Sequence, residues 1–258
     1  MKKFLCVILW FLPVTLFGQS PFDGTWKTNL AESKLSQKPN EYTVNNGMYD
    51  CESCAPKVNV KADGQDHPVN GQTYDTVAVQ VIDANTVHLT YKKGGKTELE
   101  TTRLASQDGK MLTVTNTMYP TDGSQPFKQE AKFTRVSKGP DGSNATSGSW
   151  RIQIVNEDAA GLTGTWKGAG DGLSFSRPTG WGWEAKFDGK DYPVKGTYAN
   201  ETVSLKSLGD HSIELTFKRD GKIESVEKLT VSPDGKKMTT VAENKLTGRV
   251  STYIDEKQ

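Results

Sequence analysis

Nearly the same nine residues occur twice in this chain, as DGQDHPVNG at 63–71 and as DGKDYPVKG at 188–196. The match continues downstream, where residues 75–96 correspond to residues 201–222 at one constant offset. A repeat of this length indicates two copies of a whole domain rather than a short solenoid unit. The chain has 258 residues, which is enough for two domains of ordinary size.

The matched segments share the positions of their apolar residues as well as many residue identities. Apolar and polar side chains alternate along residues 87–91 and along residues 213–217, which is typical of a strand buried on one face. A slip of one residue would turn every apolar side chain outward. The common phase therefore predicts that both copies have the same arrangement of strands.

Two tryptophans compete as the start of the second copy. SGSW ends at Trp150 and TGTW ends at Trp166, and both resemble the GTW that ends at Trp26. Trp26 lies 42 residues before Pro68 and Trp150 lies 43 residues before Pro193, whereas Trp166 lies only 27 residues before Pro193. The spacing predicts that Trp150 is the counterpart of Trp26.

The N-terminus has the pattern of a cleaved secretory signal peptide. Lys2 and Lys3 precede an apolar run that ends near Gly18. A segment rich in Gly, Ser and Pro before Trp150 is typical of a linker. The predicted organisation is a leader at 1–19, a first domain at 20–137, a linker at 138–145 and a second domain at 146–258.

The strand pattern predicts an all-β chain. Each copy contains about eight short strand-like segments separated by Gly-containing turns such as KKGGK (92–96) and SPDGK (232–236). Eight antiparallel strands suit a closed barrel, which leaves no exposed strand edge. We predict two tandem antiparallel barrels of about eight strands each, with β-sandwiches as the alternative.

The charge balance excludes an electrostatic interaction with nucleic acid. The formal net charge is +1, and it becomes −1 once Lys2 and Lys3 leave with the leader. No later segment is long and apolar enough to be an integral membrane segment. We expect an exported protein, periplasmic or secreted, with no nucleic-acid partner.

The segment FDGTWKTNLAESKL (22–35) resembles the first strand of the lipocalin and fatty-acid-binding protein group, and SGSWR (147–151) repeats part of it. In that group a Gly-x-Trp lies on the first strand, and the Trp closes one end of a barrel. The resemblance therefore implies two lipocalin-like barrels. The later repeated words also resemble a widespread repeat of exported bacterial proteins whose biochemistry is not established.

The same resemblance suggests ligand contacts near the last strand of each copy. In fatty-acid-binding proteins a basic residue and a tyrosine hold the carboxylate of the ligand. The nearest candidates here are Arg135 in the first copy, and Arg249 with Tyr253 in the second, although neither reproduces the Arg-x-Tyr of that family.

Cys51 and Cys54 admit three interpretations. In an oxidising compartment they form a local disulfide. A redox pair would need a helix at the first cysteine, yet Pro56 follows and the neighbourhood is extended. A metal site would recruit His67 and an aspartate such as Asp63 or Asp66. The disulfide is the prediction, without a metal or a cofactor.

Tryptophans mark the second copy as the better candidate site. Trp181 and Trp183 share one face of a predicted strand, and Trp166 precedes them. Such rings either pack in the core or form an apolar or sugar-stacking surface at the mouth of the barrel. Trp26 and Trp150 are instead expected to be core residues whose loss would destabilise each domain.

The function predicted from these features is non-enzymatic. We expect an exported binding protein for a small apolar or amphipathic ligand, or a glycan, held in a barrel or at its mouth. The alternative is an envelope or extracellular module that binds a protein or a polysaccharide. A hydrolase or isomerase on a barrel scaffold comes third, since the three histidines have no recognisable nucleophile beside them.

Overall fold

The computed structural model describes residues 20–121, 123–156, 159–197 and 200–258. The predicted leader, residues 1–19, lies outside the described residues. The described chain is all-β apart from one short helix, as predicted, and no helix within it is long and apolar enough to cross a membrane.

The first ten strands are β1 (Gly24–Thr28), β2 (Asn40–Asn45), β3 (Met48–Cys51), β4 (Val58–Lys61), β5 (Asp66–Pro68), β6 (Thr76–Val81), β7 (Thr86–Lys93), β8 (Lys96–Ala105), β9 (Met111–Met118) and β10 (Phe127–Lys138). The remaining elements are β11 (Gly148–Asn156), α1 (Ala159–Leu162), β12 (Thr163–Ala169), β13 (Gly172–Ser176), β14 (Gly182–Lys186), β15 (Tyr192–Lys195), β16 (Glu201–Gly209), β17 (Ser212–Arg219), β18 (Lys222–Val231), β19 (Lys237–Asn244) and β20 (Arg249–Lys257).

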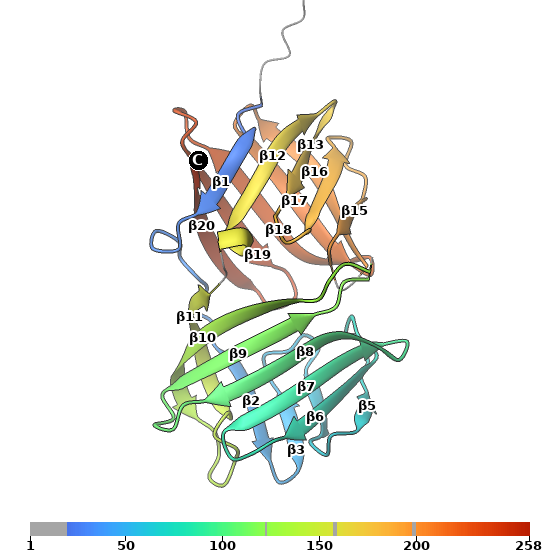
Figure 1. Ribbon diagram of the computed structural model, residues 1–258, viewed down its shortest axis with the longest axis vertical. Coiled ribbons are helices and arrows are strands. Elements are labelled where there is room, and N and C mark those ends of the chain that lie inside the picture. The colour runs from blue at the N-terminus through green and yellow to red at the C-terminus, as the bar shows by residue number, and fades with distance from the viewer. Residues whose placement is uncertain (1–19, 122, 157–158, 198–199) are drawn as a thin grey trace, which may run out of the picture.

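The strands form two antiparallel sheets stacked along the long axis of the molecule (Figure 1). We call the first the closed barrel; its order is β1-β12-β13-β14-β15-β16-β17-β18-β19-β20. We call the second the open sheet; its order is β4-β3-β2-β11-β10-β9-β8-β7-β6-β5, with β4 and β5 at its two ends.

Each sheet has ten strands, not the predicted eight or so. The difference arises in the short strands β3, β4 and β5 and in their counterparts β13, β14 and β15, which have three to five residues each. So few residues give too few alternations for the sequence to mark each strand separately.

The first strand of each copy lies in the sheet of the other copy. β1 pairs with β20 and β12, and Figure 1 shows this blue strand between them. β11 pairs with β10 and β2 in the open sheet. The closed barrel therefore combines residues 24–28 with 163–257, and the open sheet spans 40–156, which differs from the predicted domains at 20–137 and 146–258.

The segment between β1 and β2 makes this exchange feasible. Residues 29–39 follow β20, where the amide of Asn29 donates to the carbonyl oxygen of Ile254 at 2.7 Å and Lys34 forms an isolated bridge with Thr252. The segment begins with a turn, in which the amide of Ser33 donates to the carbonyl oxygen of Asn29 at 3.1 Å. Its remaining residues lead from the closed barrel, where β1 lies, to the open sheet, where β2 lies.

Trp26 and Trp150 occupy equivalent places in the two sheets. The Trp26 Nε1–H donates to the carbonyl oxygen of Phe22 at 2.8 Å, and the Trp150 Nε1–H donates to that of Thr146 at 2.8 Å. Both rings are buried. Trp166 of β12 instead pairs with Gly24 of β1. Its equivalent in the open sheet is Tyr42 of β2, which pairs with Gly148 of β11. The pairing of Trp26 with Trp150 holds, although each belongs to the sheet of the other copy.

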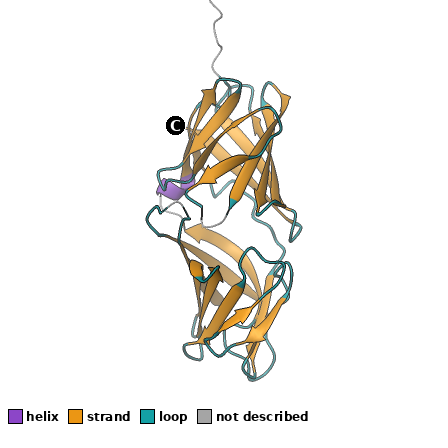
Figure 2. Ribbon diagram, turned by 90° about the vertical axis from the view of Figure 1, so that its right-hand side faces the viewer, coloured by secondary structure: helices purple, strands orange, loops and turns teal. Residues whose placement is uncertain are grey.

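The two sheets contact each other where the ends of the strands meet. Lys93 Nζ lies 2.5 Å from Asp220 Oδ2, and the amide of Thr121 donates to the carbonyl oxygen of Thr197 at 3.0 Å. Figure 2 shows the helix α1 at this junction. The loop between β9 and β10 thus lies against the lower end of the closed barrel.

Candidate functional site

The closed barrel contains a cavity of about 560 Å³. Its apolar wall is made largely of aromatic side chains from β12, β13, β14 and β17 and from the turn before β14: Trp166, Phe175, Trp181, Trp183 and Phe217. Ring centroids are 5.4 Å apart for Trp166 and Trp183, and 5.9 Å apart for Trp181 and Phe217. Such spacing is typical of aromatic pairs in contact.

The alternation of the short strands places these rings inside. Phe175 in β13 lies opposite Trp183 in β14, and both point to the core with Leu173 and Ala185. Gly164 in β12 leaves the space that the Phe175 ring fills, because a Cβ atom there would lie 2.3 Å from Phe175 Cε2. The local sequence therefore builds an aromatic wall without closing the cavity.

The cavity extends to the junction of the two sheets. Met118 of β9, together with Phe127 and Lys128 of β10, contributes to its lining from the open sheet. Thr197 lies on the same boundary and is bonded to Thr121. The open sheet therefore forms part of the boundary of a cavity that lies mainly within the other sheet.

Besides Lys128, charged side chains from four strands and one loop of the closed barrel line this cavity. Three are carboxylates, Glu201, Glu227 and Asp255, and two are guanidinium groups, Arg177 and Arg219. The arginines already have acceptors: Arg219 Nη2 lies 2.8 Å from Glu224 Oε2, and Arg177 Nη1 donates to the carbonyl oxygen of Gly161. Thr28 of the exchanged strand donates to Asp255 Oδ1 at 2.5 Å.

Burial raises the pKa of the Glu227 carboxyl to about 7, from an ordinary value of 4.5. The charge of Arg177 lowers this pKa, whereas Glu201 and Asp255 raise it further. Glu227 is surrounded by protein, and the part of its side chain that remains accessible faces the cavity. Burial also raises the pKa of Asp255, against the hydrogen bond from Thr28 and the charge of Arg177.

We predict that Glu227→Gln stabilises the barrel at alkaline pH. A carboxyl with a raised pKa binds more protons in the folded than in the unfolded state between pH 4.5 and about 7, so stability falls as the pH rises through this window. The loss is complete above the folded pKa and amounts to about 3 kcal/mol. Urea unfolding should therefore give equal stabilities for wild type and variant near pH 4, and a variant more stable by about that amount near pH 8.

The exposed Glu184 on β14 provides the control, because Glu184→Gln should leave the pH dependence unchanged. An equal stability difference between Glu227→Gln and wild type at both pH values would contradict the prediction.

The interior of the open sheet is occupied differently. Arg103 of β8 occupies the position that Leu229 has in the barrel. Its Nη1 donates to the Tyr49 hydroxyl at 3.1 Å, and its guanidinium lies 3.7 Å from the centroid of the Tyr42 ring. The arginine and the tyrosines pack together in the interior of this sheet. The two copies therefore share a fold and differ in what fills it.

Four of the six residues that the sequence suggests as ligand contacts line the cavity: Trp166, Trp181, Trp183 and Tyr253. The other two do not. Arg135 lies 3.9 Å from the centroid of the Trp150 ring and donates to the carbonyl oxygens of Ser147 and Ala145 at 2.6 Å. Arg249 donates to the carbonyl oxygen of Pro39 at 2.8 Å. Both arginines tie loops and strand ends together.

Sequence reasoning missed Arg177, Glu227 and Asp255. Two of them carried a signal, because Glu227 alternates in phase with Leu229 and Val231, and Asp255 alternates with Tyr253. A carboxylate on the inward phase of a barrel strand marks a polar group in the interior. Arg177 follows β13 in a turn and has no such signal.

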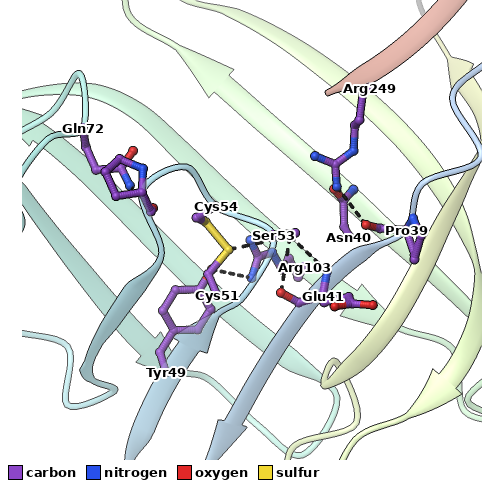
Figure 3. The surroundings of a disulfide bond; sticks show 11 residues. Pro39, Asn40, Glu41, Tyr49, Cys51, Ser53, Cys54, Gln72, Arg103 and Arg249 are labelled. Carbon is purple, nitrogen blue, oxygen red and sulfur yellow. Dashed lines mark hydrogen bonds between the residues drawn. A yellow bond between two sulfur atoms is a disulfide. The ribbon is translucent and has the colours of Figure 1, made fainter. Parts of the chain in front are cut away.

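Cys51 and Cys54 form the predicted disulfide, with a Cα–Cα distance of 5.4 Å (Figure 3). The bond takes up both sulfur atoms, and His67 Nε2 contacts Asp63 Oδ1 at 2.8 Å on the surface. Neither cysteine therefore has a free thiol in this structure, as the redox and metal interpretations would require. The disulfide lies in the open sheet, away from the residues that line the barrel cavity.

Comparison with known proteins finds no matching family, curated protein or solved structure. The lipocalin-like resemblance thus stays an expectation from the sequence.

Proposed function

We propose that this chain is an exported, non-enzymatic binding protein that holds a small amphipathic ligand inside the closed barrel. The observation that supports it is a cavity of about 560 Å³ with aromatic walls and a few ionisable groups. Ligand sites typically have volumes of about 300–1,000 Å³, mostly apolar linings and a small number of polar groups. The leader pattern and the disulfide support export.

The cavity favours a ligand over a protein or polysaccharide partner. Trp166 and Trp183 are buried, so their rings meet only what enters the barrel. A surface module would instead present its aromatic side chains on exposed loops or strand faces. A glycan fits this proposal only as a short unit enclosed in the cavity.

An enzyme acting on the same ligand is the second candidate, and Glu227 favours it. A carboxyl group with a pKa near 7 can both take and give a proton at neutral pH. If the wild type binds a compound that copurifies with it and does not convert that compound, binding is the function. Conversion that depends on Glu227 would support the enzyme.

We expect the neutral probe N-phenyl-1-naphthylamine to bind with one molecule per chain, with a rise in probe fluorescence and energy transfer from tryptophan. Trp181 is half-buried, and its ring centroid lies 5.6 Å from that of Phe175. Removing a ring contact of this size costs about 1.5–3 kcal/mol. Trp181→Ala should weaken probe binding about 10- to 100-fold.

A matched control lies in the open sheet, where Tyr74 is packed against Tyr91 at 4.7 Å between ring centroids. Tyr74→Ala should leave probe affinity unchanged. Equal affinities of wild type and Trp181→Ala, with both proteins folded by circular dichroism, would place the probe outside the cavity.

A further inference from the structure

With the exposed Lys128 set aside, the charges around the cavity are unbalanced. Glu201, Glu227 and Asp255 contribute three carboxylates to the lining against the two guanidinium groups of Arg177 and Arg219. Arg219 pairs with Glu224, which lies outside the lining, at 2.8 Å. Arg177, which also donates to the carbonyl oxygen of Gly161, acts electrostatically on both Glu227 and Asp255. Lys128 is exposed at the boundary with the open sheet.

The Glu227 carboxylate lacks the contacts that normally compensate a buried charge. Among the described residues no group donates a hydrogen bond to it, whereas Asp255 accepts one from Thr28. An enclosed carboxylate is stabilised in its charged form by a cation or by hydrogen-bond donors. A ligand that brings both into the cavity would supply what the protein does not.

A second polar atom in the wall points to the same ligand. The Trp183 Nε1–H is buried and has no hydrogen-bond acceptor among the described residues, although Trp183 lines the cavity. Indole N–H groups usually find an acceptor when buried. Arg177 Nε and Arg219 Nε are also buried without an acceptor among the described residues. The cavity therefore offers the Trp183 donor on its aromatic wall, these two guanidinium N–H groups, and the Glu227 carboxylate, to which no described group donates a hydrogen bond.

We propose that the ligand is an organic cation, a protonated amine on an aromatic or apolar body, whose ammonium group pairs with Glu227. The body packs against the rings of Trp166, Trp181 and Phe217, whose faces also attract a cation. An oxygen or nitrogen acceptor on the body accepts from Trp183 Nε1. This inference rests on the proposed ligand site and adds the charge of the ligand.

The test compares three probes that differ only in the end group: 4-phenylbutylamine, 4-phenylbutan-1-ol and 5-phenylpentanoate. Affinities are measured by calorimetry at neutral pH with the full chain. The amine should bind about 10-fold more tightly than the alcohol, since hydrogen bonds to charged groups are stronger than those to neutral ones. It should bind about 100-fold more tightly than the carboxylate, because like charges in an enclosed site repel.

Two variants separate the role of Glu227 from a general structural effect. Glu227→Gln should weaken the amine about 10-fold or more and leave the alcohol unchanged, which a merely structural role would not do. Glu184→Gln, on the outer face of β14, should change neither affinity.

The outcomes distinguish the two proposals. If N-phenyl-1-naphthylamine binds but the amine binds no better than the alcohol or the carboxylate, or binds equally well to Glu227→Gln, the cationic ligand is refuted and the ligand site stands. If neither the neutral probe nor any of the three compounds binds, the ligand site itself is refuted.

Discussion

Residues 159–258 alone are expected not to fold, and they are expected to fold when a peptide of residues 20–39 is added. The fragment contains β12 to β20 but lacks β1, so β12 and β20 would be left as unpaired edges. It would also lose Trp26, which is buried in the barrel core. Near-ultraviolet circular dichroism and a cooperative thermal transition should appear only with the peptide.

The matched control is the fragment of residues 40–156, which contains all ten strands of the open sheet. It should fold without any addition, because its core and its strand pairs lie within this range. A cooperative transition of residues 159–258 without the peptide would contradict the exchange of β1 into the barrel.

Replacing the two equivalent tryptophans should destabilise opposite sheets. Trp26→Ala should destabilise the closed barrel of residues 163–257, and Trp150→Ala should destabilise the open sheet of residues 40–156, each by about 3–5 kcal/mol. Each change removes a fully buried ring and its hydrogen bond to a carbonyl oxygen. Hydrogen exchange, followed separately for the two sheets, measures the effect.

The sheet that each substitution destabilises distinguishes the exchanged arrangement from a contiguous one. If each copy folded from its own contiguous sequence, Trp26→Ala would open residues 40–137 instead and Trp150→Ala would open residues 163–257. Trp26→Phe and Trp150→Phe serve as controls that keep most of the packing. They should cost about 1–3 kcal/mol each, mainly for the unsatisfied carbonyl group.

The sequence predicted the repeated all-β fold because the alternation of apolar and polar residues is visible within each strand. The phase of Leu89 and Leu215 is preserved, and both are buried on the inner face of their strands. The spacing that relates Trp26 to Trp150 also holds in the structure. Local patterns such as these report which side of a strand is buried, whichever sheet the strand joins.

The exchange of β1 and β11 could not be predicted in the same way. Both strands carry the same Gly-x-Trp pattern, so either could fill the place beside β12 or beside β2. The choice depends on how residues 29–39 run along β20, which is a matter of tertiary packing. Domain ranges taken from the sequence repeat therefore assign β1 and β11 to their own copies and miss the exchange.

The cavity was predicted only in part. The sequence identifies the aromatic residues of the second copy, and the structure places Trp166, Trp181 and Trp183 in the wall. The sequence does not reveal that Tyr42 and Arg103 are in contact inside the open sheet. Nor does the sequence bring together Arg177 and Glu227, which lie fifty residues apart, both line the cavity and interact electrostatically.

Methyl nuclear magnetic resonance with 4-phenylbutylamine tests most directly whether the ligand enters the closed barrel. If the ligand enters the barrel, the methyl groups of Leu215, Leu229 and Met238, which line the cavity, should show saturable shifts, and those of Leu89 and Leu112 in the core of the open sheet should show none. Shifts confined to Leu89 and Leu112, or to the exposed Leu208 and Leu246, would contradict it.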